Sequence, residues 1–272
     1  MTLELSGATR LHYIVGDPIA QVKSPAGVTA DLQASGHNAV CVPAHVAPAD
    51  LSAWLAGVSL AQNVDGVIVT VPHKFACHDL CATTSERAAF LHTVNTMRRN
   101  ADGSWHGDMF DGLGYVTAMR EKGCDPAGKK ALLVGAGGAG SAIAHALVTA
   151  GVSELALFDA DDARRNTLVQ RLAGMGRCPV GHGTADPSGF DIVINATPMG
   201  MRDGDPLPVD VTRLLPTTFV GCVITSPAVS PLVAAARDAL LAQMPQLKAL
   251  CDVSLWATDT EVLDERAVLK PD

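Results

Sequence analysis

A glycine-rich loop between an apolar strand and an alanine-rich helix constrains this chain more than any other feature. Residues 130–134, KALLV, have the pattern of a buried strand, and residues 141–150, SAIAHALVTA, that of a helix. Between them run Gly135, Ala136, Gly137, Gly138, Ala139 and Gly140. The first glycine of such a loop permits a tight turn, the second lets the backbone approach a pyrophosphate, and the third lets the helix pack on the strand. An ordinary glycine-rich turn is the alternative, but the flanking strand and helix favour a dinucleotide site.

An acidic residue lies where a dinucleotide site needs one. Asp159 directly follows the next predicted strand, residues 155–158. A carboxylate at this point binds the ribose hydroxyls of NAD and repels the 2′-phosphate of NADP. Arg164 and Arg165 are the opposing observation, because arginines also grip phosphates. They come later, within the predicted helix 162–175, so the sequence predicts that NAD is preferred over NADP.

Strands and helices alternate along the whole chain. In the second half, further strands are predicted over residues 192–195 and 219–224 and a helix over 231–243. In the first half, strands are predicted over 11–15, 38–43, 64–71 and 93–98, and helices over 48–56 and 85–91. We therefore predict an α/β protein with an N-terminal α/β substrate domain, residues 1–106, and a Rossmann-type NAD-binding domain with a doubly wound parallel sheet, residues 107–241. Residues 242–272 are expected to pack back on the first domain.

Composition agrees with this plan and excludes several classes of protein. Apolar residues make up 48% of the 272 residues and aromatic residues only 4%, so the core must be aliphatic, as in parallel sheets buried on both faces. The net charge is −8 without a basic run, so we expect no nucleic-acid partner. No apolar stretch reaches about 18 residues and no signal peptide is apparent, which predicts no membrane partner and a cytoplasmic location. Seven cysteines without a CxxC pair and nine histidines without zinc spacing predict no metal site.

Six short motifs between residues 16 and 232 resemble those of the shikimate dehydrogenase family, in the same order. Residues 16–25, GDPIAQVKSP, resemble G-x-P-I-x-x-S-x-S-P, and residues 69–74, VTVPHK, resemble V-T-V-P-x-K. Residues 94–96, VNT, and 107–112, GDMFDG, resemble the family's V-N-T and G-x-N-T-D-G. Residues 195–201, NATPMGM, resemble N-A-T-P-x-G-M, and residues 225–232, TSPAVSPL, are similar to Y-x-P-x-x-T-P-L.

The resemblance implies NAD(P)-linked oxidation of a ring hydroxyl in a small hydroxylated cyclic carboxylate. It implies Lys74 and Asp111 as a catalytic pair that face each other across a cleft between the domains. Oxidation of an alcohol needs a group that takes the hydroxyl proton as hydride leaves the carbon. A lysine does this near neutral pH only when burial lowers its pKa, and a nearby carboxylate opposes that shift while it fixes the ammonium. A salt bridge that merely joins the two domains is the alternative.

The resemblance also implies the residues that bind the two ligands. Substrate binding falls to Ser24, Thr70, Asn95 and Thr225. Cofactor binding falls to the glycine loop together with Asp159, Asn195 and Thr197.

Several positions depart from the family's pattern. The first of the two serines that hold the substrate carboxylate in the family is Val22 here, and the asparagine before V-T-V-P is Ile68. The residues before the catalytic acid are Met109 and Phe110 instead of asparagine and threonine, and the family's tyrosine is Thr225. The final glutamine-bearing helix of the family has no clear counterpart in residues 250–268. Each lost hydrogen bond to a buried polar ligand costs about 1–3 kcal/mol, so we expect shikimate to be a poor substrate.

Two interpretations follow. The first is an NAD-dependent dehydrogenase for shikimate, quinate or a less polar ring acid, active as a monomer or homodimer. The second is a non-catalytic NAD-binding sensor that kept the fold. The presence of both Lys74 and Asp111 favours the enzyme, because a sensor has no need of the pair.

Overall fold

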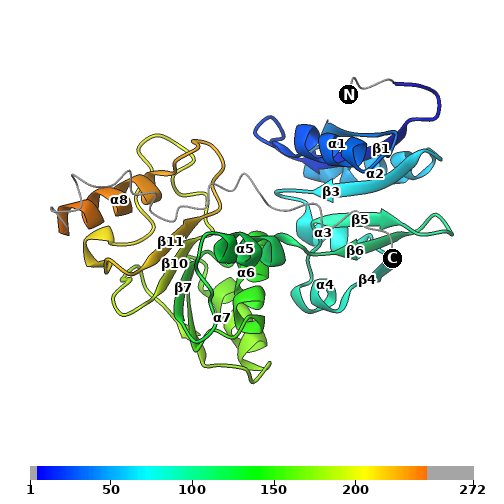
Figure 1. Ribbon diagram of the computed structural model, residues 1–272. Helices are drawn as coiled ribbons and strands as arrows, with labels where there is room; N and C mark the ends of the chain where they lie inside the picture. Colours follow the sequence, from blue (N-terminus) through cyan, green and yellow to red (C-terminus); the bar gives the residue numbers. More distant parts are fainter. Residues whose placement is uncertain (1–4, 244–272) are drawn as a thin grey trace. The chain divides into compact units, whose positions relative to one another are not determined.

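The computed structural model describes residues 5–243, which divide into two compact units, residues 5–110 and 111–243 (Figure 1). The chain passes from one unit to the other at the peptide bond between Phe110 and Asp111. This point follows the proposed boundary at residue 106 by a few residues, because Trp105–Asp108 forms a strand of the first unit's sheet. The segment predicted to return to the first domain is residues 242–272, of which 244–272 lie outside the described residues.

The first unit contains a mixed sheet with the strand order β2-β1-β3-β5-β6-β4. Its strands are β1 (Arg10–Gly16), β2 (Ala39–His45), β3 (Val64–Val69), β4 (Thr83–Thr84), β5 (Thr96–Arg99) and β6 (Trp105–Asp108). Its helices are α1 (Ser24–Ala34), α2 (Leu51–Ser59), α3 (Lys74–Asp79) and α4 (Glu86–Leu91), with a 3-10 turn, η1 (Pro48–Asp50), before α2. Strand β1 pairs in parallel with β2 and β3, whereas β5 pairs antiparallel with both β3 and β6.

This pairing brings distant segments of the first unit to one edge of its sheet. Because β3 and β6 are both antiparallel to β5, and β4 is parallel to β6, the carboxyl ends of β1, β3, β4 and β6 lie at the same edge as the amino end of β5. The four motifs of residues 16–25, 69–74, 94–96 and 107–112 all begin or end at that edge. Side chains placed after parallel strands in this way are where open α/β sheets bind ligands.

The second unit contains an all-parallel sheet with the order β11-β10-β7-β8-β9. Its strands are β7 (Lys130–Val134), β8 (Glu154–Phe158), β9 (Val180–His182), β10 (Ile192–Asn195) and β11 (Phe219–Cys222). Its helices are α5 (Asp111–Glu121), α6 (Gly138–Thr149), α7 (Asp162–Ala173) and α8 (Pro231–Gln243), and η2 (Val211–Arg213) is a 3-10 turn. The strand order reverses between β7 and β10, which is the switch point of a doubly wound sheet. The predicted fold class is confirmed.

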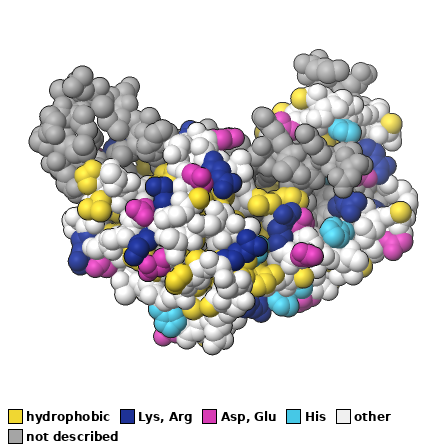
Figure 2. Space-filling view, turned by 60° about the horizontal axis from the view of Figure 1, so that its bottom comes forward, with side chains coloured by type: hydrophobic (Ala, Val, Ile, Leu, Met, Phe, Trp, Pro, Cys, Tyr) yellow, Lys and Arg dark blue, Asp and Glu magenta, His cyan; other side chains and the backbone are white. Residues whose placement is uncertain are grey.

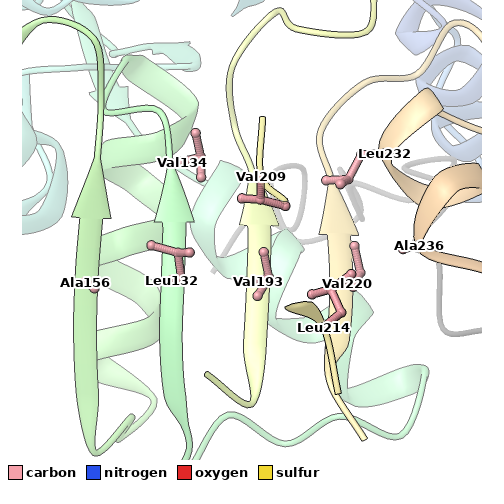
Figure 3. Close-up of a cluster of buried hydrophobic side chains, with 9 residues drawn as sticks. All are labelled: Leu132, Val134, Ala156, Val193, Val209, Leu214, Val220, Leu232 and Ala236. Atoms are coloured by element: carbon pink, nitrogen blue, oxygen red, sulfur yellow. The ribbon is translucent and has the colours of Figure 1, made fainter. Parts of the chain in front are cut away.

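A cluster of aliphatic side chains from this second sheet is joined by residues of α8, which packs beside β11 (Figure 3). Leu132 and Val134 of β7, Val193 of β10 and Val220 of β11 belong to one cluster with Leu232 of α8. All five side chains are at most 7% exposed. Helix α6 contacts both α5 and α7. Helix α6 also contacts β8, and α7 contacts β8 and β9. The strands β7, β8, β10 and β11 are largely buried, which is why apolar residues follow one another in them without polar alternation, whereas the edge strand β9 is more exposed.

The described surface carries charges of both signs. On the face shown in Figure 2, lysine and arginine side chains are interspersed with aspartate and glutamate. Among residues 5–243, no helix is both long and apolar enough to cross a membrane.

Candidate active site

The opening motif and the V-T-V-P motif meet at the carboxyl ends of β1 and β3. The Thr70 amide donates to the Val15 carbonyl at 2.9 Å, and the Asp17 amide donates to the Val71 carbonyl at 3.0 Å. A Cβ atom on Gly16 would overlap the methyl group of Thr70, so only glycine allows the two segments to lie this close. The structure therefore brings the predicted substrate residue Thr70 against the loop that leads to Ser24.

Lys74 is held at the start of helix α3 by its neighbours. The imidazole of the buried His73 makes a 2.8 Å hydrogen bond with the Val46 carbonyl, and the Val94 amide donates to the Lys74 carbonyl at 3.0 Å. The Lys74 side chain is partly buried, and the apolar Val71 and Phe75 beside it are 61% and 48% exposed. The backbone of the predicted catalytic lysine is thus held by hydrogen bonds on both sides, and exposed apolar side chains lie beside it in the sequence.

The side chain of Asn95 is tied to the segment that precedes Asp111. Its Oδ1 accepts a hydrogen bond from the Phe110 amide at 2.9 Å and another from the Thr96 hydroxyl at 3.2 Å. Its backbone bridges two strands, because its carbonyl accepts from the Val69 amide and its amide donates to the Asp108 carbonyl. Asn95, which the sequence analysis assigns to substrate, also organises the end of the first unit.

Two of the apolar replacements in the first unit, Val22 and Ile68, lie on one hydrophobic cluster. Val22 and Ile68 are both partly buried and pack against a core that includes Ile14 and Val28. Ser24 begins helix α1 and is partly buried. The loop that carries Ser24 therefore presents an apolar side chain at position 22, two residues before the serine.

Asp111 is the first residue of helix α5 and only 6% exposed. Helix α5 packs closely on α6 in the second unit, because a Cβ atom on Gly112 would overlap the Ala142 carbonyl. The buried carboxylate therefore starts a helix that is fixed against the helix of the glycine loop.

The glycine loop has the conformation that a dinucleotide requires. Gly135 has a φ of 106°, and a Cβ atom there would lie 2.7 Å from the Ala196 carbonyl carbon. A Cβ atom on Gly140 would overlap the Gly135 carbonyl, whereas one on Gly137 would meet nothing within 4 Å. The first and third glycines are thus needed for packing, and the second faces open space at the amino end of α6, where backbone N–H groups attract phosphate.

The N-A-T-P segment lies directly against this loop, across the switch point of the sheet. Asn195 is completely buried, and its Oδ1 accepts from the Thr197 amide at 3.0 Å and from the Thr197 hydroxyl at 2.6 Å. Its Nδ2 donates to the Met199 carbonyl at 3.1 Å. Asn195 therefore shapes the turn, while Thr197 is partly exposed beside Gly135. Thr225 follows β11 in the same unit and is also partly exposed.

Asp159 lies at the end of β8, as predicted, and is 6% exposed. Its carboxylate accepts from the backbone amides of Ala136 at 2.6 Å and Asp161 at 2.8 Å. Arg164 donates to both oxygens, at 2.7 Å through Nη2 and 3.3 Å through Nε. Burial opposes ionisation, but the Arg164 and backbone hydrogen bonds outweigh it and lower the pKa of Asp159. This ion pair, which was not predicted from the sequence, joins α7 to the end of β8, and the Ala136 amide ties the glycine loop to the same carboxylate.

Comparisons with known proteins show the family to which the chain belongs. The family model of the shikimate dehydrogenase substrate binding domain matches residues 14–97. A shikimate dehydrogenase (NADP(+)) of Rubrobacter xylanophilus is 39% identical over 246 residues, which cover 89% of this chain and 86% of that protein. The chain belongs to the shikimate dehydrogenase family. It is an NAD(P)-dependent oxidoreductase of the shikimate and quinate dehydrogenase type.

Two solved structures of the shikimate dehydrogenase family share the fold. Shikimate 5-dehydrogenase of Listeria monocytogenes, in complex with shikimate and NAD, is 27% identical with a TM-score of 0.77, over 88% of this chain and 87% of that one. Quinate dehydrogenase of Corynebacterium glutamicum, in complex with NAD, is 31% identical with a TM-score of 0.75, over 85% of this chain and 86% of that one. The relatives thus include enzymes named for NADP and structures that hold NAD.

Proposed function

We propose that this member of the family oxidises, reversibly and with NAD, a ring hydroxyl of a hydroxylated cyclic carboxylate that is less polar than shikimate where it meets Val22 and Ile68. One observation supports the substrate most directly: these two side chains pack on the same apolar cluster, beside the loop of Ser24 and the strand end of Thr70. An apolar group there cannot donate a hydrogen bond to a carboxylate, and the unpaired oxygen would bear its desolvation cost.

In the proposed reaction, Lys74 and Asp111 act on the same hydroxyl group. Lys74 takes the hydroxyl proton, and Asp111 orients the ammonium group and offsets its charge. A nicotinamide cofactor held by the glycine loop would supply the acceptor for the hydride that leaves the carbinol carbon. The rigid backbone on both sides of Lys74 supports this role, because a general base must be held within hydrogen-bond reach of the proton that it removes.

The glycine loop fits a dinucleotide, and different residues in and beside it would contact different parts of that ligand. The backbone from Gly137 to Gly140, at the amino end of α6, would hold the pyrophosphate, where Gly137 leaves open space and the N–H groups point outward. Thr197 lies beside Gly135, close enough to the loop to border the same ligand.

The preference for NAD rests on Asp159. Its carboxylate already accepts four hydrogen bonds, two from backbone amides and two from Arg164. A ribose hydroxyl must therefore displace a donor, and the arginine is the one that can move, since its side chain is 48% exposed. Once Arg164 leaves, the buried carboxylate repels a 2′-phosphate, which favours NAD.

The test is the rate of NADH or NADPH formation with shikimate, quinate and ring acids that lack one hydroxyl, together with calorimetric titration of both cofactors. We expect turnover with NAD, and a higher kcat/KM for at least one of the less polar acids than for shikimate. Efficient use of shikimate would refute the altered substrate, and tighter NADP binding would refute the cofactor preference. Cofactor binding without turnover of any acid would favour a sensor.

A further inference from the structure

The last residues of the first unit, Asp108–Phe110, are held by several hydrogen bonds and an ion pair. Asp108 ends β6, and its Oδ1 accepts from Arg87 Nε at 2.7 Å, from the Met109 amide at 2.7 Å and from the hydroxyl of Ser85. Arg87 Nη2 donates to the other oxygen at 2.6 Å, so the guanidinium and carboxylate form a two-pronged pair. The two side chains are 28% and 17% exposed, which makes this pair less accessible to water than an ordinary surface salt bridge.

The same arginine also packs on the residue before Asp111. The guanidinium carbon of Arg87 lies 4.5 Å from the centre of the Phe110 ring, within the range of a cation–π interaction. The Phe110 amide donates to Asn95, and Met109, which lies between Asp108 and Phe110, is 1% exposed. Every residue from Asp108 to Phe110 is thus fixed by its side chain, its backbone or both, and Arg87 is bonded to the first and stacked on the last.

We propose that Arg87 is a positioning residue for Asp111, acting through Asp108 and Phe110. Asp111 follows Phe110 by one peptide bond, so the segment that Arg87 immobilises leads directly into the backbone of Asp111. This inference rests on the proposed function, in which Asp111 orients the catalytic lysine. Small displacements of a catalytic group, of about 1 Å, cost as much as 10²-fold in rate, so loosening this segment should lower kcat more than it raises KM.

The first unit offers a matched control in Arg99, at the far end of β5. Arg99 Nη1 donates to the Ala61 carbonyl at 2.7 Å, and its guanidinium lies 5.8 Å from the centre of the Trp105 ring. It therefore combines hydrogen bonding with aromatic stacking as Arg87 does, but on β5 and at the end of β6 opposite to Asp108, the residue that Arg87 of α4 binds. Loss of either arginine should destabilise the unit to a similar extent.

The experiment compares Arg87→Ala, Arg87→Lys, Asp108→Asn and Arg99→Ala in the full-length protein. We expect Arg87→Ala to lower kcat by about 10-fold to 10²-fold, with KM and the NAD dissociation constant changed by less than about 3-fold. Arg87→Lys should recover part of the rate, and the double variant of Arg87 and Asp108 should be no slower than Arg87→Ala, because both changes break one unit. Arg99→Ala should lower the melting temperature yet keep kcat in the folded fraction.

Equal effects of Arg87→Ala and Arg99→Ala on kcat would overturn the proposal, and a rise in KM alone would make Arg87 a substrate-binding residue instead. Hydrogen exchange measured by mass spectrometry distinguishes failure of the positioning role from failure of the proposed function, because the exchange measurement needs no turnover. We expect faster exchange in peptides that contain the Met109 and Phe110 amides in Arg87→Ala and not in Arg99→Ala. Unchanged exchange there would refute the positioning role even if no ring acid proved to be a substrate.

Discussion

Replacement of Val22 by serine tests the altered substrate domain most sharply. Val22 is partly buried on the cluster of Ile14 and Val28, so its two methyl groups contribute to stability. At about 0.8 kcal/mol per fully buried methylene, a half-buried pair is worth roughly 1 kcal/mol, a loss that a folded protein of ordinary stability tolerates. A serine hydroxyl that regains one net hydrogen bond to the substrate returns about 1–1.5 kcal/mol, which lowers KM for shikimate about 5-fold to 10-fold.

Steady-state kinetics with shikimate as the varied substrate gives the answer, and two further variants isolate the hydroxyl. Val22→Ala creates the same space without a donor, and Val22→Thr adds a donor while it keeps one methyl group. We expect KM to fall in the serine and threonine variants and not in the alanine variant. The reasoning fails if serine and alanine give the same KM, or if the unchanged protein already has a low KM for shikimate.

Three further outcomes follow from the second unit. Asp159→Asn should release Arg164 and improve NADP binding relative to NAD, measured by calorimetric titration; unchanged selectivity would show that this carboxylate does not discriminate. The pKa of Asp159 is lower in the folded protein than in the unfolded chain, where it is about 3.9. The ionised carboxylate therefore contributes to stability above the unfolded value, and this contribution is lost as the pH falls through the folded value. The melting temperature of Asp159→Asn should thus depend less on acid pH than that of the unchanged protein. Gly140→Ala should abolish cofactor binding or prevent folding, because a Cβ atom there overlaps the Gly135 carbonyl; normal binding would mean that the loop adapts.

The parts of the fold that carry strong local signals could be predicted from the sequence. The strand, glycine loop and helix of residues 130–150 were predicted because an apolar run, three spaced glycines and an alanine-rich segment follow one another. Helix α3 was missed, since six residues with the sequence KFACHD have no apolar periodicity. Strand β6 was missed as well, although Asp102 and Gly103 between it and β5 are a hairpin signal that could have revealed it.

The contacts of the site residues were harder to predict than their positions. The position of Asp159 at a strand end is predictable from the sequence, whereas Arg164 looks remote from it because it lies within the next helix. Helix α7 begins at Asp162, and side chains in a first turn lean toward the helix amino end, so the long arginine side chain reaches back to Asp159. Likewise, no spacing rule joins Arg87 to Asp108, because the contact depends on β4 lying beside β6 in the sheet.

The central claim is that Lys74 and Asp111 carry out the reaction. The most direct test is the turnover of Lys74→Ala and Asp111→Asn, with NAD affinity and melting temperature measured on the same samples. We predict that Lys74→Ala abolishes NADH formation and that Asp111→Asn lowers it by about 10²-fold or more, the usual scale for acid–base groups. NAD affinity and melting temperature should change little in either variant. A large loss of stability in both variants, with normal activity in the folded fraction, would contradict the account and leave the two residues with a purely structural role.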